Sequence, residues 1–144
     1  MQFQSILILT GAGISAESGV DTFRDVGGIW SKVRLEDVAT PEGFARDPAM
    51  VHDFYNQRRA GLAGVKPNPA HLALARLERE FSGSVTVVTQ NIDDLHERAG
   101  SRHVVHMHGE LLSALCRACE GRVRWERELL DHPPCPGCGH AELR

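Results

Sequence analysis

The stretch ILILTGAGISAESGVDTFR, residues 6–24, decides the fold of this chain. It begins with four apolar residues that show no polar alternation, a pattern that favours a strand buried on both faces, as in a parallel sheet. Two glycines follow at once, and the next five residues, ISAES, can open a helix. A strand, a glycine turn and a helix start in this order form a cradle for phosphate, because the free N–H groups of a helix start point at the anion.

The spacing Gly11-x-Gly13-x-x-Ala16 fits the dinucleotide fingerprint that ends in glycine or alanine. A glycine-rich stretch after a strand is also often only a turn. The usual companion is an acidic residue about 20 positions further on, which binds the ribose. Glu36 and Asp37 lie near that distance, but no strand pattern leads into them. We therefore expect that a dinucleotide bound here is not held as in ordinary dehydrogenases.

The bulk composition excludes several classes of protein. The chain has 144 residues, of which 42% are hydrophobic and 24% charged, as in a globular protein of one domain. The formal net charge of −3 does not favour nucleic acid or an anionic membrane as a partner, and we expect neither. No apolar run approaches the roughly 20 residues that span a bilayer, and the N-terminus lacks the basic segment of a signal peptide. We expect a cytoplasmic protein.

A run of β-branched residues at 85–89 and the short segment HVVHM at 103–107 predict further strands of the same sheet. Asn68-Pro69 gives a helix N-cap followed by proline at the first helical position, and an amphipathic helix follows up to Gly83. A short helix precedes Gly100. Strands that alternate with helices predict an α/β fold, here a partial doubly wound, Rossmann-like parallel sheet.

Polar residues follow two of these strands. Gln90, Asn91 and Asp93 come directly after the second strand, and His108 follows the third. Ligands of doubly wound sheets bind beyond the carboxyl ends of the strands. We therefore expect these residues and the Gly11 turn to converge on one crevice.

All four cysteines form two Cys-x-x-Cys pairs, Cys116 with Cys119 and Cys135 with Cys138, separated by 15 residues. In a cytosolic chain this spacing indicates zinc rather than disulfides. The alternatives are free buried cysteines or redox pairs. Four thiolates leave no open position for water, so we expect one structural Zn²⁺ in a zinc-ribbon module, with the nearby His140 a bystander.

The motifs GAGISAESGVDTFR (11–24), TQNIDDLH (89–96), HGE (108–110) and the two cysteine pairs, in this order, resemble a sirtuin, an NAD-dependent protein-lysine deacylase of bacterial type. The resemblance runs over essentially all 144 residues. It implies that NAD is a co-substrate and that acylated-lysine proteins or peptides are the partners. The implied products are free lysine, nicotinamide and O-acyl-ADP-ribose.

The resemblance implies that His108, in the family's HG motif, is the general base for a ribose hydroxyl. A histidine titrates near neutral pH, which suits that role. In a strand, His106 and His108 share a face, so geometry alone does not choose between them. The adjacent Gly109 and the motif favour His108. For His96, His103 and His106 the default is a hydrogen-bonded structural role.

Asn91 and Asp93 match family residues that contact the ribose and the nicotinamide amide, and we place them with His108 as catalytic. Asp93 can accept from an amide NH₂, and Asn91 can hold a hydroxyl or a water. Alternatively, the two cap the following helix. Phe23 would shield the reactive carbon and Arg24 would contact the phosphates or ribose, unless they are a core aromatic and a solvated charge. The cofactor-binding residues expected from the resemblance are Gly11, Ala12, Gly13, Ala16, Phe23, Arg24, Gln90, Asn91, Ile92 and Asp93.

Tyr55 and Arg58 resemble the Tyr-x-x-Arg pair of the sirtuin branch that removes succinyl and malonyl groups. Three residues apart, they share a helix face, and a guanidinium with a phenol can bind a carboxylate. The alternative is a half-buried core tyrosine and a solvated basic patch that Arg58 forms with Arg59.

We expect residues 1–112 to form the N-terminal part of a Rossmann-like NAD-binding domain, with a helical insert at about 31–67, and residues 113–144 to form the zinc module. Sirtuins continue well past the second cysteine pair, with further strands and the loops that hold the adenosine half of NAD. The first strand would otherwise be left as an apolar sheet edge. We therefore expect a fragment or a truncated gene product. The competing hypothesis is a non-catalytic zinc-ribbon interaction module on an incomplete nucleotide-binding fold.

Overall fold

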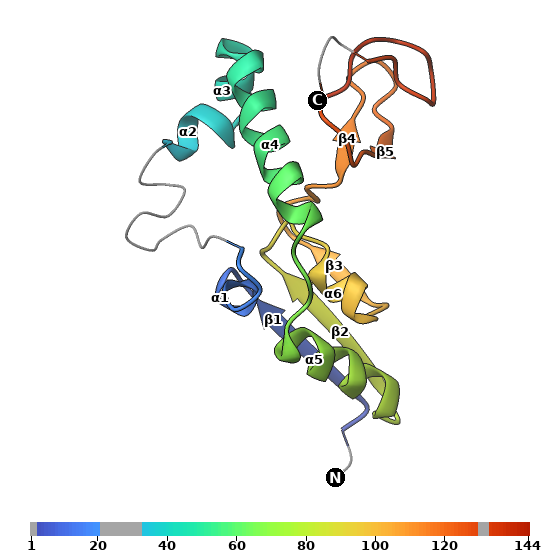
Figure 1. Cartoon of the computed structure of the whole chain (residues 1–144). Helices are drawn as coiled ribbons and strands as arrows, with labels where there is room; N and C mark the ends of the chain where they lie inside the picture. The colour runs from blue at the N-terminus through green and yellow to red at the C-terminus, as the bar shows by residue number, and fades with distance from the viewer. Residues whose placement is uncertain (1–2, 21–32, 130–132) are drawn as a thin grey trace. The chain divides into compact units, whose positions relative to one another are not determined.

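The computed structural model describes residues 3–20, 33–129 and 133–144, and Figure 1 shows the course of the chain. The chain divides into two compact units, each built from two separate segments. The first unit comprises Met1–Gly28 and Val65–Glu110, and the second comprises Ile29–Gly64 and Leu111–Arg144. Among the described residues, no helix is long and apolar enough to cross a membrane.

The first unit contains a three-stranded parallel sheet, which confirms the predicted fold class. Its strands, in spatial order, are β1 (Ser5–Thr10), β2 (Ser84–Thr89) and β3 (Val104–His106). Thr10 lies opposite Thr89, and Thr89 lies opposite His106. The carboxyl ends of all three strands are therefore level, so the loops that follow them emerge at one edge of the sheet.

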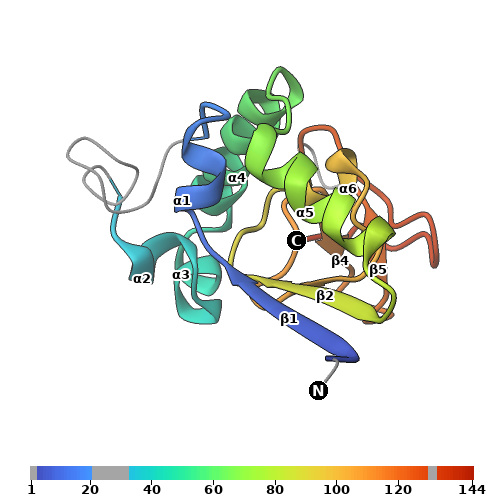
Figure 2. The same cartoon turned by 90° about the horizontal axis from the view of Figure 1, so that it is seen from below.

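The helices described in the same unit are α1 (Gly13–Ala16), α5 (Pro69–Glu80) and α6 (Leu95–Ala99). Helix α5 lies across one face of the sheet (Figures 1 and 2). It begins as predicted: the Asn68 side chain accepts hydrogen bonds from the N–H groups of Ala70 and His71. The reciprocal bond of this capping box goes from the Asn68 N–H to Nδ1 of His71, where most capping boxes use glutamate.

The prediction that β1 is buried on both faces is wrong. Leu7 is 73% exposed and Leu9 is 64% exposed, whereas Ile6 and Ile8, which point to the other side, are half-buried. Within the first unit, the described helices lie on one face of the sheet (Figure 2). An apolar run does not reveal how many of its faces have a neighbour, because that depends on segments far away in sequence.

The described residues of the second unit form three helices and a short antiparallel hairpin. These elements are α2 (Leu35–Val38), α3 (Pro41–Arg46), α4 (Pro48–Ala63), β4 (Ser113–Leu115) and β5 (Arg122–Arg124). Helix α4 follows the cap residue Asp47, whose side chain accepts a hydrogen bond from the Met50 N–H. The helical insert expected at about 31–67 thus belongs to the same compact unit as the cysteines.

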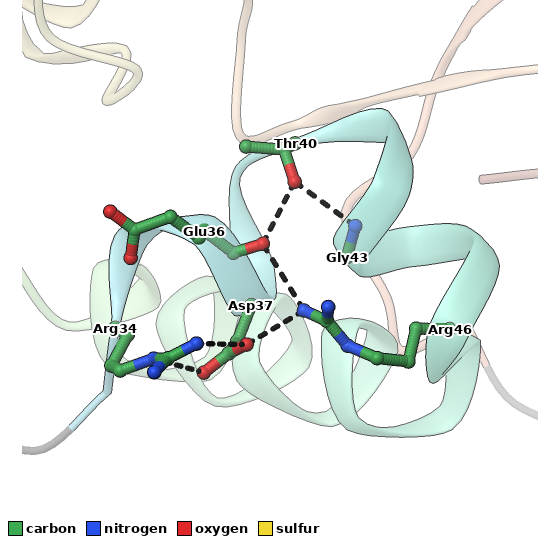
Figure 3. Close-up of polar contacts among 6 residues, drawn as sticks. All are labelled: Arg34, Glu36, Asp37, Thr40, Gly43 and Arg46. Atoms are coloured by element: carbon green, nitrogen blue, oxygen red, sulfur yellow. Dashed lines mark hydrogen bonds and ion pairs between the residues drawn. The ribbon is translucent and has the colours of Figure 1, made fainter.

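Helices α2 and α3 are joined by the contacts drawn in Figure 3. The Asp37 carboxylate pairs with Arg34 at 3.1 Å and with Arg46 at 2.7 Å, and Thr40 caps α3 by accepting from the Gly43 N–H. A Cβ at Gly43 would lie 2.5 Å from the Asp37 carbonyl oxygen, so the two helices can approach this closely only with glycine. Asp37, one of the two acidic residues near the ribose-binding distance, is therefore engaged in ion pairs within this cluster.

Buried polar side chains join α4 to the cysteine-containing segment. Asn56 accepts from the Leu129 N–H at 2.8 Å and donates to the Leu129 carbonyl at 3.3 Å, while Arg59 donates to the Leu111 carbonyl at 2.9 Å. These bonds explain why α4 and the cysteine-containing segment form one unit although they are far apart in the sequence. The same unit has an apolar core of Ala114, Cys116, Trp125, Leu129, Cys135 and Leu143.

Candidate active site and metal centre

The four cysteines of the second unit converge as predicted. Their Sγ atoms all lie within 4.8 Å of one another, with 3.6 Å between Cys116 and Cys138 and 4.0 Å between Cys119 and Cys135. Four thiolates around a tetrahedral zinc, at Zn–S distances of about 2.3 Å, are about 3.8 Å apart. The donor set therefore fits one Zn²⁺, and His140 contributes no atom to the cluster.

In the first unit, the centre of the site is Ser15 at the start of α1, only 1% exposed. Its hydroxyl donates to Oδ2 of Asp93 at 3.0 Å and accepts from Nδ2 of Asn91 at 3.0 Å. Asn91 and Asp93 are themselves buried. The structure thus brings the two predicted residues together through a third, Ser15, which sequence reasoning missed even though it lies inside the GAGIS motif. We call Ser15, Asn91 and Asp93 the Ser15 junction.

Asp93 also serves the alternative role that the sequence suggested. Its Oδ1 accepts from the Leu95 N–H at 3.2 Å, at the start of α6. Both carboxylate oxygens are therefore fixed, one by a helix N–H and one by a hydroxyl. The capping role and a binding role are compatible, because each carboxylate oxygen has two lone pairs.

The glycine turn beside this junction has open space. A Cβ at Gly13 would meet nothing within 4 Å, and one at Gly11 would meet only the Gln90 side chain, at 4.0 Å. The packing within the protein therefore does not require glycine at these positions, whereas a ligand that approaches the backbone would. The turn fits the cradle that a dinucleotide phosphate needs. Phe23 and Arg24 lie outside the described residues.

Two buried histidines, His71 and His96, lie next to the Ser15 junction and contact each other. Nε2 of His96 is 2.9 Å from Oγ1 of Thr10, and Nε2 of His71 is 3.5 Å from Oγ of Ser15, with the two rings packed edge to face at 4.9 Å between centroids. Burial lowers the pKa of both histidines, and the charge of Asp93 only partly offsets this effect. Both rings are therefore neutral at physiological pH.

His106 and His108, the two candidates for the base, have different surroundings. Nδ1 of His106 lies 2.9 Å from the Asn91 carbonyl oxygen, and its Nε2 lies 2.7 Å from Oε1 of Glu97. Both partners accept, so the ring carries two protons, and the hydrogen bond that it donates to Glu97 raises the pKa of His106 to about 9. A ring already protonated at neutral pH is a poor general base. His108 is exposed just beyond β3, before Gly109 with its left-handed φ of 83°, and its role as base stays a prediction.

The remaining predicted residues lie around the same edge of the sheet or in the second unit. Gln90 extends the ladder between β1 and β2 by donating its N–H to the Thr10 carbonyl, and Ile92 is half-buried. His103 contacts Glu78 at 2.6 Å, in keeping with the structural role expected for it.

Tyr55 and Arg58 are both half-buried on α4 in the second unit. Burial raises the pKa of Tyr55, while the charges of Arg58 and Arg59 oppose the rise. The phenol therefore keeps its proton and can donate it in a hydrogen bond. Arg58 packs over the Phe54 ring at 5.3 Å. Arg59 is buried, bonded to Leu111 and Asn56, so it does not form a solvated patch with Arg58.

Comparison with known proteins identifies the family. A model of the Sir2 family matches residues 11–141, and the chain therefore belongs to the Sir2 family. It is 66% identical over 138 residues to an NAD-dependent protein deacylase of Vibrio parahaemolyticus serotype O3:K6, a match that covers 94% of this chain and 57% of the relative. It is 56% identical over 140 residues to one of Vibrio cholerae serotype O1, with 96% and 57% covered.

Solved structures agree with this assignment. A crystal structure of a Sir2 homologue in complex with NAD matches with a TM-score of 0.84 and 43% sequence identity, covering 98% of this chain and 55% of that one. The chain thus spans 57% of the length of the curated relatives it matches.

Proposed function

We propose that this chain carries the reacting part of an NAD-dependent protein-lysine deacylase. The observation that supports this most directly is the Ser15 junction, which holds Asn91 and Asp93 buried at the carboxyl ends of the strands, beside an open glycine turn. The relatives in Vibrio are named NAD-dependent protein deacylases, and a related homologue was solved with NAD. NAD would supply the electrophilic ribose carbon and nicotinamide as the leaving group.

The residues of the first unit have separate roles in this proposal. His108, exposed beyond β3, accepts the proton of a ribose hydroxyl. Asp93 is held at both oxygens before any ligand arrives, so it can accept from the nicotinamide amide without reorganising. The amide of Asn91 contacts the ribose or an ordered water. Gly11, Ala12, Gly13, Ala16, Gln90 and Ile92 would line the cofactor beside them, with Phe23 and Arg24 completing its cover.

The zinc would be structural, because four thiolates complete its coordination. Zinc thiolates persist where thiols stay reduced, which supports our proposal of a cytoplasmic location. In functional terms we divide the chain into a nucleotide-binding part, residues 1–112 with the insert at about 31–67, and a zinc module, residues 113–144.

The test of the function is nicotinamide release from NAD in the presence of an acyl-lysine peptide. We expect release by the wild-type protein at the full length of its relatives, of which this chain spans 57%, and loss of release in His108→Tyr of the same length. The matched control is His103→Tyr, which places the same substitution at an exposed histidine at the other end of β3. Equal rates in the two variants would refute His108 as the base. A folded, zinc-loaded wild type that neither binds NAD nor releases nicotinamide would favour the non-catalytic interaction module.

For the acyl group, we propose a preference for succinyl- and malonyl-lysine. Support comes from Tyr55 and Arg58 on one side of α4, where a protonated phenol and a guanidinium can both donate to a carboxylate. Arg58→Met should slow desuccinylation more than deacetylation. Arg46→Met, which removes an arginine from an exposed ion pair, is the control. Equal losses on acetyl and succinyl peptides would refute the preference.

A further inference from the structure

His106 connects the strand that leads to His108 with the loop that carries Asn91. It lies opposite Thr89 in the pairing of β2 with β3, and the Met107 N–H donates to the Thr89 carbonyl at 2.9 Å. From this fixed backbone the ring reaches along the sheet to the Asn91 carbonyl oxygen, 2.9 Å from Nδ1. The loop after β2 and the end of β3 are therefore joined by a side chain as well as by the ladder.

Asn91 makes hydrogen bonds through its backbone N–H, its carbonyl and its side chain. Its N–H donates to Oγ1 of Thr89 at 3.1 Å, its carbonyl accepts from His106, and its side-chain amide donates to Ser15. The first two bonds fix the peptide units on either side of Asn91, so they also fix the direction of its side chain. Without the His106 bond, the Asn91 carbonyl would be free to rotate and to turn the amide away from Ser15.

We propose that His106 is a positioning residue of the deacylase reaction: its ring donates one proton to the Asn91 carbonyl and the other to Glu97, and so holds Asn91 in register with His108. We call these two hydrogen bonds the His106 clamp. The inference rests on the proposed function, and it assigns His106 no contact with NAD or acyl-lysine.

The clamp needs both ring protons, and its surroundings favour them. The His106 side chain is 7% exposed, a burial that alone would disfavour its charge. The charged and titratable groups that face it are Glu97 and His96 on α6 and Glu110 after β3. Both glutamates favour the imidazolium, and His96 is kept neutral by its own burial. Above about pH 9 the ring would lose one proton, and one of the two acceptors would lose its donor.

Two substitutions separate the halves of the clamp. In His106→Asn the amide nitrogen can take the place of Nδ1 and still donate to Asn91, but it cannot reach Glu97. In His106→Gln the amide can reach Glu97 but not the Asn91 carbonyl. We expect His106→Asn to keep kcat for nicotinamide release within about threefold and His106→Gln to lower it about tenfold to a hundredfold, with KM for the peptide unchanged, because small misplacements in a site have effects of this size. His103→Gln is the control that should leave kcat unchanged.

The pH dependence of kcat gives a second measurement, which would not change if His106 had only a structural role. Wild-type kcat should fall above about pH 9, where the clamp loses a proton. In Glu97→Gln the new amide can donate to Nε2 of a neutral ring, whose single N–H proton then stays on Nδ1 and is donated to the Asn91 carbonyl. The alkaline fall should therefore disappear. Persistence of the same fall in Glu97→Gln would overturn the proposal.

A readout independent of activity distinguishes this proposal from the proposed function. The ¹⁵N chemical shifts of the His106 ring should show two protons at pH 7.5, and the ¹³C signal of the Asn91 carbonyl should titrate together with the ring. A neutral ring, or an active wild type with equal kcat in His106→Asn and His106→Gln, would overturn the clamp alone. An inactive wild type with a doubly protonated ring would overturn the proposed function, and the positioning role with it.

Discussion

Replacing Ser15 by alanine tests the Ser15 junction most directly. The substitution removes one oxygen and leaves the backbone of α1 unchanged. The charged carboxylate of Asp93 loses the hydrogen bond that its Oδ2 accepts from the Ser15 hydroxyl, which is worth about 1.5–3 kcal/mol, and the Asn91 amide loses an acceptor worth about 0.5–1.5 kcal/mol. Asp93 keeps the hydrogen bond from the Leu95 N–H, so its buried charge still has one hydrogen-bond donor. We expect the free energy of unfolding of the first unit to fall by about 2–4 kcal/mol.

The assay is urea unfolding followed by the backbone amide NMR signals of β2, which report on the first unit alone. With an m-value of about 2 kcal/mol/M, the midpoint should fall by about 1–2 M. Nicotinamide release should fall as well, because Asn91 and Asp93 lose their common partner.

Ser18→Ala is the matched control for this experiment. Among the described residues, Oγ of Ser18 is buried with no hydrogen-bond partner, so its removal should be neutral or should stabilise the protein by up to about 1 kcal/mol. A Ser15→Ala midpoint within about 0.3 M of the Ser18→Ala midpoint would refute the reasoning. It would mean that the junction contributes no net stability.

Further expectations concern the metal and pH. Removal of zinc by a chelator, or Cys135→Ser, should unfold the second unit, because Cys135 is part of its apolar core; a Trp125 fluorescence spectrum that stays the same would contradict this. His71 and His96 have a lowered pKa, so the unfolded chain binds protons that the folded chain does not, and the stability present above pH 6.5 should be lost as pH falls. The pKa of His106 is raised to about 9, so its contribution is full below pH 6.5 and is lost as pH rises through 9. Urea midpoints from pH 5 to 10 should pass through a maximum, and a flat profile would refute both assignments.

The local signals of the sequence were sufficient for the sheet and the metal cluster. The cap at Asn68, the strand at 84–89 and the two cysteine pairs all depend on neighbours within a few residues, and the structure has them where they were expected. The number of covered faces of β1 could not be predicted, because Leu7 and Leu9 look the same in sequence whether or not a second layer covers them.

Only part of the organisation of the candidate site could be predicted from the sequence. Asn91 and Asp93 could be identified by their place after a strand, whereas Ser15 bonds to residues more than 70 positions away, and no local pattern reports such contacts. His106 was correctly expected to be hydrogen-bonded, but its two acceptors, and hence its charge, emerge only when α6 and β3 lie together. The same limit hid Asn56, whose partner Leu129 is 73 residues further on.

The histidine in the capping box of α5 has a consequence for the direction of the hydrogen bonds that Ser15 makes. His71 receives the Asn68 N–H at Nδ1, so its only proton must lie on Nε2, which faces Ser15. That proton and the Asn91 amide use both lone pairs of the Ser15 oxygen, and the hydroxyl proton then has one remaining acceptor, Asp93. The start of a helix thereby determines that Asp93 meets Ser15 as an acceptor. The backbone N–H of Asn68 thus sets which groups donate to Ser15 and which group accepts from it before any substrate binds.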